Sequence, residues 1–361
     1  MSSYKNKVIL FRSVYSTFFG FVNFGYVAIM SVTGLSYAQI SLLITLSFLS
    51  QTLSYFLLVL VRIKRGLVVS SLLNLAIPII LVLEKNFLVF LIISIISGFA
   101  DALFSAIVVI QKDFTKKDYS IMMSSTFIAQ VIGLGLYYFS SYINLEYLLA
   151  IISGISFIGV IISLNLSYEE EKPQLKGFVN FLKTEGKFIT ALLSLATLRR
   201  VFIGSILSVV FISAFSYISK DYLSLYFAIF QLPLVFFLYF GHKISNKVYL
   251  VLTLADFLVY ISLVRFYSIS PIIFLGMILL IKAMDFLRSP LAEAALLQKM
   301  NYSTTATSFF SLLDSTLSVI TGGIFTALIS LKLYSLLFLL TGLSSLSADL
   351  LVYRLVKEYK E

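Results

Sequence analysis

Long apolar runs recur along the whole sequence and constrain its fold more than any other feature. Runs of 18 or more mostly apolar residues alternate with short polar segments, and the first covers 8–30. A helix of that length crosses a hydrocarbon core of about 30 Å. Helices are expected because the backbone must satisfy its own hydrogen bonds in lipid, and these runs are too long and uniformly apolar for barrel strands. The sequence therefore predicts an all-α, polytopic membrane protein.

Twelve transmembrane helices are expected, and the longest polar segment divides them into six plus six. This segment contains the acidic run Glu169–Glu171 and a weakly amphipathic stretch that fits the membrane interface. We predict an N-terminal six-helix bundle over 1–166, a cytoplasmic linker over 167–189 and a C-terminal six-helix bundle over 190–361. The expected spans are 8–30, 37–61, 66–83, 87–111, 120–141, 145–166, 190–218, 221–241, 247–265, 270–297, 304–328 and 331–353.

The basic residues predict how the chain is oriented. Most lysines and arginines fall in every second loop and at both termini, whereas the other loops hold few. The positive-inside rule then places both termini in the cytoplasm, with the protein in the cytoplasmic membrane. The formal net charge of +10 has the same origin, so it indicates contact with anionic lipid headgroups and not a nucleic-acid partner. We expect a monomer.

Composition argues against an enzyme, a metal site or a bound cofactor. There is no cysteine, and His242 is the single histidine, so thiolate and multi-histidine metal sites are excluded. No nucleophile-elbow motif and no phosphate-binding loop occurs in the sequence. An integral-membrane enzyme is therefore the least favoured class of function.

Ionisable residues inside the apolar runs are the main functional signal. The stretch from Leu279 to Ala295 contains Lys282, Asp285, Arg288 and Glu293. Each charge at a helix centre costs roughly 2.5–3.5 kcal/mol on insertion scales, so charges facing lipid are unfavourable. At about 100° per residue, Lys282, Asp285 and Glu293 share one sector of a helix. This sector is expected to face a protein interior or a water-filled path.

Similar polar stripes occur in the first, fourth and seventh expected spans, which suggests one shared path. The alternative interpretation is that Asp285–Arg288 and Arg12–Asp101 are ion pairs that only hold helices together. Asp256 is expected to be structural, and Asp314 fits a polar group bonded to the seventh or tenth span. The candidate residues for a substrate or proton pathway are Arg12, Asn23, Asp101, Arg199, Arg200, Lys282, Asp285, Arg288, Glu293 and Asp314.

The two halves of the chain share polar landmarks at a common offset of about 180–187 positions, as expected for an internal repeat. Arg12 aligns with Arg199, and Asp101 aligns with Asp285. We predict that the two six-helix bundles are pseudo-symmetric copies of one unit.

In these features the chain resembles transporters of the major facilitator superfamily. The resemblance covers nearly the whole length: twelve spans, a central loop, two similar halves and a basic loop after the second and eighth spans. Arg62 and Arg65 match cations of that family's loop motif, G-x-x-x-D-R-x-G-R-R, whereas Val61 replaces its aspartate. The resemblance implies that spans 1, 4, 7 and 10 line a central cavity, and that Arg62 and Arg65 take part in gating.

The expected function is secondary active transport of a small solute by alternating access, coupled to protons, with import and export both open. A coupling carboxylate must become buried and rehydrated in turn, and Asp101 and Asp285 are the leading candidates. A passive channel or a lipid scramblase is the alternative. The expected partners are a small-molecule substrate, protons and membrane lipids.

Overall fold

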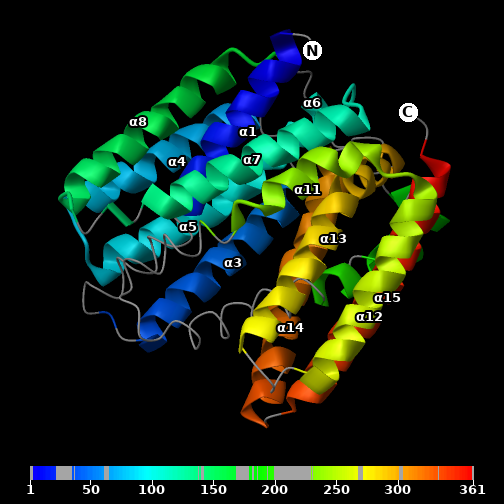
Figure 1. Cartoon of the computed structure of the whole chain (residues 1–361). Coiled ribbons are helices and arrows are strands. Elements are labelled where there is room, and N and C mark those ends of the chain that lie inside the picture. The colour runs from blue at the N-terminus through cyan, green and yellow to red at the C-terminus, as the bar shows by residue number, and fades with distance from the viewer. Residues whose placement is uncertain are drawn as a thin grey trace.

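The structure is all-helical wherever it is described (Figure 1). It is a computed structural model that describes residues 3–21, 35, 37–60, 65–136, 138–139, 142–167, 179–180, 183–184, 186–192, 194–198, 229, 231–266, 271–300, 304–331 and 333–359. Within these ranges, six helices are long and apolar enough to cross a membrane. The prediction of a polytopic helical membrane protein is therefore confirmed at this level.

The helices begin and end close to the expected boundaries. The fourth expected span, 87–111, consists of two helices separated by a short turn, and the fifth begins at Lys116, before its expected start at 120. We call α1 to α8 the N-half: α1 Ser3–Phe21, α3 Tyr37–Leu60, α4 Gly66–Leu83, α5 Phe87–Phe104, α6 Ile107–Ile110, α7 Lys116–Leu136 and α8 Leu145–Leu164. We call α11 to α15 the C-half: α11 Leu234–Phe240, the 3-10 helix η3 Gly241–Lys243, α12 Asn246–Phe266, α13 Pro271–Lys299, α14 Thr304–Ser330 and α15 Tyr334–Glu358.

Short polar side chains cap the N-terminal ends of several helices. The Asn86 side chain accepts a hydrogen bond from the Val89 backbone N–H at the start of α5. Asn144 does the same for Glu146 at the start of α8. Before α7, the Asp118 carboxylate accepts from the backbone N–H of Thr115. Such caps satisfy backbone donors that would otherwise lack partners at a helix start.

Glycines set the closest helix contacts of the N-half. A Cβ at Gly133 on α7 would overlap the carbonyl oxygen of Thr17 on α1. A Cβ at Gly98 on α5 would overlap the carbonyl oxygen of Ser47 on α3. Only glycine lets the backbones approach this closely, as in small-residue helix contacts of other membrane proteins. These two contacts fix where α1 and α5 present their polar side chains.

Both chain termini lie at the same end of the bundle, and one hydrophobic cluster there joins the two halves (Figure 1). Tyr4 and Tyr359, near the two termini, pack against this cluster. We call it the shared cluster, and its buried residues are Val8, Ile9, Phe11, Leu67, Ile107, Val108, Ile110, Phe114, Tyr119, Met122, Leu166, Ile189, Ala294, Leu297, Met300, Ala306 and Phe310.

At the opposite end, each half has a hydrophobic cluster of its own among the described residues. In the N-half it joins the end of α1 to the beginning of α5, for example through Phe21 and Phe90. In the C-half it joins the end of α12 to the beginning of α13, for example through Tyr260 and Phe274. The two halves therefore share a buried apolar core at the terminus end, whereas their opposite ends have separate cores.

Large apolar side chains cover the outer surface of the helices. Leu53 and Phe56 on α3, Ile158 on α8 and Leu258 on α12 are all well exposed. Such a surface is unfavourable in water and favourable against acyl chains. Together with the six apolar helices, it gives the chain the features of an integral membrane protein.

Candidate functional site

The most densely charged site lies inside the C-half and is centred on Arg288. The Nη2 atom of Arg288, on α13, donates to Asp285 Oδ1 on the same helix at 2.7 Å and to Asp256 Oδ2 on α12 at 3.0 Å. Its Nη1 donates to Asp349 Oδ2 on α15 at 2.5 Å and to the hydroxyl of Thr253 at 3.0 Å. The Arg288 side chain is only 3% exposed, so these bonds form away from water. We call Arg288, Asp256, Asp285 and Asp349 the arginine cluster.

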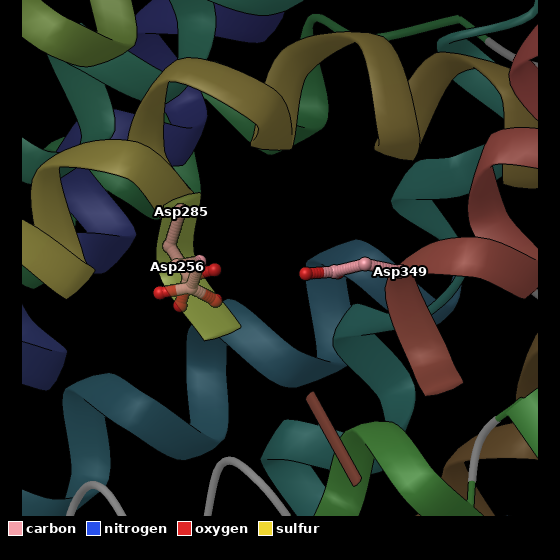
Figure 2. A group of neighbouring side chains, drawn as sticks. All are labelled: Asp256, Asp285 and Asp349. Carbon is pink, nitrogen blue, oxygen red and sulfur yellow. The ribbon is translucent and has the colours of Figure 1, made fainter. Parts of the chain in front are cut away.

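Three helices converge to form the arginine cluster. Figure 2 shows Asp256 and Asp285 next to each other, with the Asp349 carboxylate directed toward them. Asp285 and Arg288 are three residues apart, which places them on one face of α13. Ser345 on α15 donates a further hydrogen bond to Asp256 Oδ2 at 2.9 Å. The cluster therefore holds α12, α13 and α15 together.

The three carboxylates of the arginine cluster also have the spacing of metal ligands, since one oxygen of each lies within 4.8 Å of the others. The guanidinium of Arg288 donates to all three. A cation that is part of the protein thus already compensates these carboxylates. The geometry therefore describes a buried ion-pair network, in which a bound metal would have to compete with Arg288.

A different polar site lies in the N-half around Asp101, on α5. Tyr15 on α1 donates its hydroxyl to Asp101 Oδ1 at 2.5 Å. The Tyr15 ring stacks on Phe104 with ring centroids 3.7 Å apart, and the centroid of the Phe19 ring lies 6.5 Å from that of Tyr15. Asp101 forms no ion pair with any residue that the structure describes. Its carboxylate is therefore held by a hydroxyl group beside aromatic rings, with no cation among its described neighbours.

Hydroxyl groups connect the Asp101 site to the C-half. Tyr55 on α3 is within electrostatic reach of both Asp101 and Asp314, and its hydroxyl lies close to Gln51 and to Ser311 on α14. One turn away, Thr52 and Ser315 are joined by a hydrogen bond of 3.0 Å. Asp101 therefore lies close to the boundary between the two halves.

Arg12 and Glu293 face each other across the same boundary, nearer to the terminus end. Each lies within electrostatic reach of the other, but no hydrogen bond or ion pair joins them. The Arg12 guanidinium contacts the sulfur of Met122 at 3.5 Å, and its buried Nε has no hydrogen-bond partner in the structure as described. Lys282 is within electrostatic reach of Asp285.

The intramembrane charges had two interpretations: a shared polar path, or ion pairs that hold helices together. The structure distinguishes them for some residues. The Asp285–Arg288 ion pair is confirmed, and Asp256 belongs to the same network. The Arg12–Asp101 ion pair is not formed, because Asp101 accepts its hydrogen bond from Tyr15 and Arg12 is directed toward α7. Thr197, in the seventh expected span, donates a hydrogen bond to Asp314, as one reading of the sequence anticipated.

Several candidate residues lie outside the described residues or away from these sites. Arg65 precedes α4 with a left-handed backbone (φ 54°) and an exposed side chain, and the structure does not test its expected gating role. The candidates outside the described residues are Asn23, Arg62, Arg199 and Arg200.

Sequence reasoning missed Asp349, Tyr15 and Tyr55. Asp349 was overlooked because it lies near the end of the last apolar run, where a charge is inexpensive. A signal was present: Thr341, Ser345 and Asp349 are spaced four residues apart on one face of a helix, and all three are buried. Tyr15 and Tyr55 had no comparable signal, since tyrosine is common in this chain.

Two comparisons of the sequence with known proteins found no match. No model of a known protein family matches the sequence, and no curated protein is detectably similar to it. Function must therefore be inferred from the geometry of the two charged sites and of the boundary between the halves.

Proposed function

We propose that this protein is a secondary active transporter that moves a small solute by alternating access and couples the movement to protons. In this proposal the chain has twelve spans in two pseudo-symmetric halves, as in the major facilitator superfamily. Both termini lie in the cytoplasm, in agreement with the basic loops. The carrying observation concerns the residues that the structure describes: the halves share a buried core at the terminus end and have separate cores at the other. Ionisable groups from both halves lie at the boundary between them.

The pairing of helices supports a duplicated architecture. The contact between α3 and α14 joins expected spans 2 and 11, and that between α7 and α11 joins spans 5 and 8. In a repeat of six spans, span 2 corresponds to span 8 and span 5 corresponds to span 11. The contact between spans 2 and 11 therefore has the contact between spans 8 and 5 as its counterpart. The same shift converts the pair α4 and α8 into the pair α12 and α15, both of which are in contact. A parallel repeat predicts such matched pairs.

The distribution of the apolar cores supports alternating access. The shared cluster closes the boundary between the halves at the terminus end. Separate cores at the other end let each half move as a unit while its own packing is kept. We propose that this arrangement is the state closed toward the cytoplasm, and that breaking the shared cluster produces the opposite state.

The Asp101 site is the better candidate for proton coupling. A carboxylate without a cationic partner is costly to bury in its charged form, so it is favoured to take up a proton when water leaves. Asp285 is different, because Arg288 compensates its charge at 2.7 Å. We propose that Asp101 exchanges the proton and that the arginine cluster stabilises the C-half.

Spin-label distance measurements test alternating access without knowledge of the substrate. The chain has no cysteine, so labelled pairs need no background substitution. Lys117→Cys with Lys247→Cys reports on the terminus end, and Tyr142→Cys with Leu331→Cys reports on the opposite end. We expect a change of pH to lengthen the mean distance at one end and shorten it at the other. Fixed distances at both ends would favour a channel or a scramblase and contradict the proposal.

A further inference from the structure

The carboxylate of Asp101 lies in a setting that fits a positively charged ligand. It receives one hydrogen bond, from Tyr15, and no described lysine or arginine forms an ion pair with it. Arg12, one turn away on α1, contacts Met122 instead. Among the residues that the structure describes, Tyr15 from α1, Tyr55 from α3 and Asn74 from α4 are the polar groups close to the site. The asparagine side chain is uncharged, and the two tyrosines are uncharged while their hydroxyl groups keep their protons.

Aromatic rings add an apolar surface beside the carboxylate of Asp101. The Tyr15 hydroxyl is 2.5 Å from Asp101 Oδ1, so a cation touching that oxygen also lies close to the Tyr15 ring. The rings of Phe104 and Phe19 lie close to the same ring. Because Phe104 stacks on the face of the Tyr15 ring, these rings supply apolar surface for the non-polar part of a ligand.

We propose that Asp101, together with Tyr15 and Tyr55, forms the recognition site for a lipophilic organic cation, such as one with a quaternary or delocalised charge. This inference rests on the proposed transport function and names its substrate class. The carboxylate supplies the charge that balances the ligand, and the rings of α1 and α5 bind its apolar part. Inorganic cations fit less well, because the described surroundings offer few oxygen ligands.

The position of Asp101 explains how such a ligand is coupled to protons. A proton and an organic cation neutralise the same carboxylate, so binding of one displaces the other. Tyr55 connects the site to Ser311 and lies within electrostatic reach of Asp314, so occupancy is sensed by the C-half. The result is exchange of one cation for one proton, with no other reactant.

Equilibrium dialysis with labelled tetraphenylphosphonium tests the inference on the purified full-length protein in micelles, with empty micelles subtracted. We expect saturable binding that tetraphenylborate, an anion of the same shape, does not inhibit. Asp101→Asn should weaken binding at least tenfold, whereas Asp101→Glu, which keeps the charge, should retain most of it. Asp113→Asn is the matched control, because Asp113 is exposed in the loop before α7.

Absence of saturable binding, or equal binding by Asp101→Asn, would overturn the inference. Loss of binding in Glu293→Gln with normal binding in Asp101→Asn would also overturn it, because the cation site would then lie at Glu293. Failure of the transport proposal looks different: the probe would bind through Asp101 while the spin-label distances at both ends stay fixed. Opposite distance changes without probe binding would leave transport standing and remove only the cation site.

Discussion

Asp101 and Asp285 lie on the fourth and tenth expected spans, at positions that align between the two halves of the sequence, yet their surroundings are opposite. Asp285 is bridged by Arg288, which also binds Asp256 and Asp349. Asp101 is bonded to the hydroxyl of Tyr15 and borders on the other half. The difference teaches that an intramembrane carboxylate becomes structural when the fold supplies a cation for it. Around Asp101 the described residues supply no such cation, and we propose that a proton or a ligand balances its charge.

Removal of the central cation of the arginine cluster should have the largest effect on folding. Arg288→Leu leaves three carboxylates together without compensation, and losing one partner of a buried ion pair costs roughly 3–5 kcal/mol. We expect little monomeric protein in size-exclusion chromatography after mild heating. Arg265→Leu, at an exposed site on α12, should behave like the wild type. Equal heat resistance of Arg288→Leu would show that the cluster does not stabilise the C-half.

Displacement of α1 should damage the Asp101 site from a distance. Gly133→Ala introduces a Cβ that overlaps the Thr17 carbonyl, two residues along α1 from Tyr15. Overpacking of this kind typically costs about 1–3 kcal/mol. We expect a lower unfolding temperature and weaker tetraphenylphosphonium binding. Gly154→Ala is the matched control, because nothing lies within 4 Å of its added Cβ. Unchanged binding in Gly133→Ala would mean that the site tolerates movement of α1.

Removal of one carboxylate charge from the arginine cluster should have a smaller effect than removal of Arg288. In Asp285→Asn, Arg288 keeps its bonds to Asp256 and Asp349. The loss of one charge-assisted hydrogen bond amounts to about 2 kcal/mol. We expect modest loss of thermal stability and full binding of the probe cation. Abolished cation binding with a normal unfolding temperature would assign the ligand site to Asp285 instead.

The mildest change tests the hydroxyl that holds Asp101. Tyr15→Phe keeps the ring and its stacking on Phe104 but removes the donor to Asp101. One net hydrogen bond contributes about 1 kcal/mol, so stability should fall slightly. Probe binding should persist because both the carboxylate and the ring remain. Tyr147→Phe, at an exposed position, is the control. A large loss of stability would show that Tyr15 has further buried partners.

The sequence predicted the helices well, because length and hydropathy determine a membrane helix almost alone. α4 begins and ends at the expected residues, and α8 begins at the expected residue. The start of α7 was missed because its first turn is polar, and Thr115 and Asp118 cap a helix that begins before the apolar run.

The partners of the charged residues could be predicted only where they share a helix. Asp285 and Arg288 are three residues apart, so their pairing follows from helical periodicity. Asp349 joins them from α15 across 61 positions of the chain, which only tertiary packing determines. Asp101 was expected to pair with Arg12 but accepts a hydrogen bond from Tyr15. Tertiary packing determines this partner too, because Arg12 on α1 contacts Met122 on α7 instead.

Infrared difference spectroscopy between acidic and alkaline samples tests the central comparison most directly, because it needs no substrate. A protonated carboxylic acid has a carbonyl stretching band that disappears when the proton leaves. The account predicts such a band in the wild type, its loss in Asp101→Asn and its persistence in Asp285→Asn. A band that survives in Asp101→Asn and disappears in Asp285→Asn would contradict the account and place the exchangeable proton in the arginine cluster.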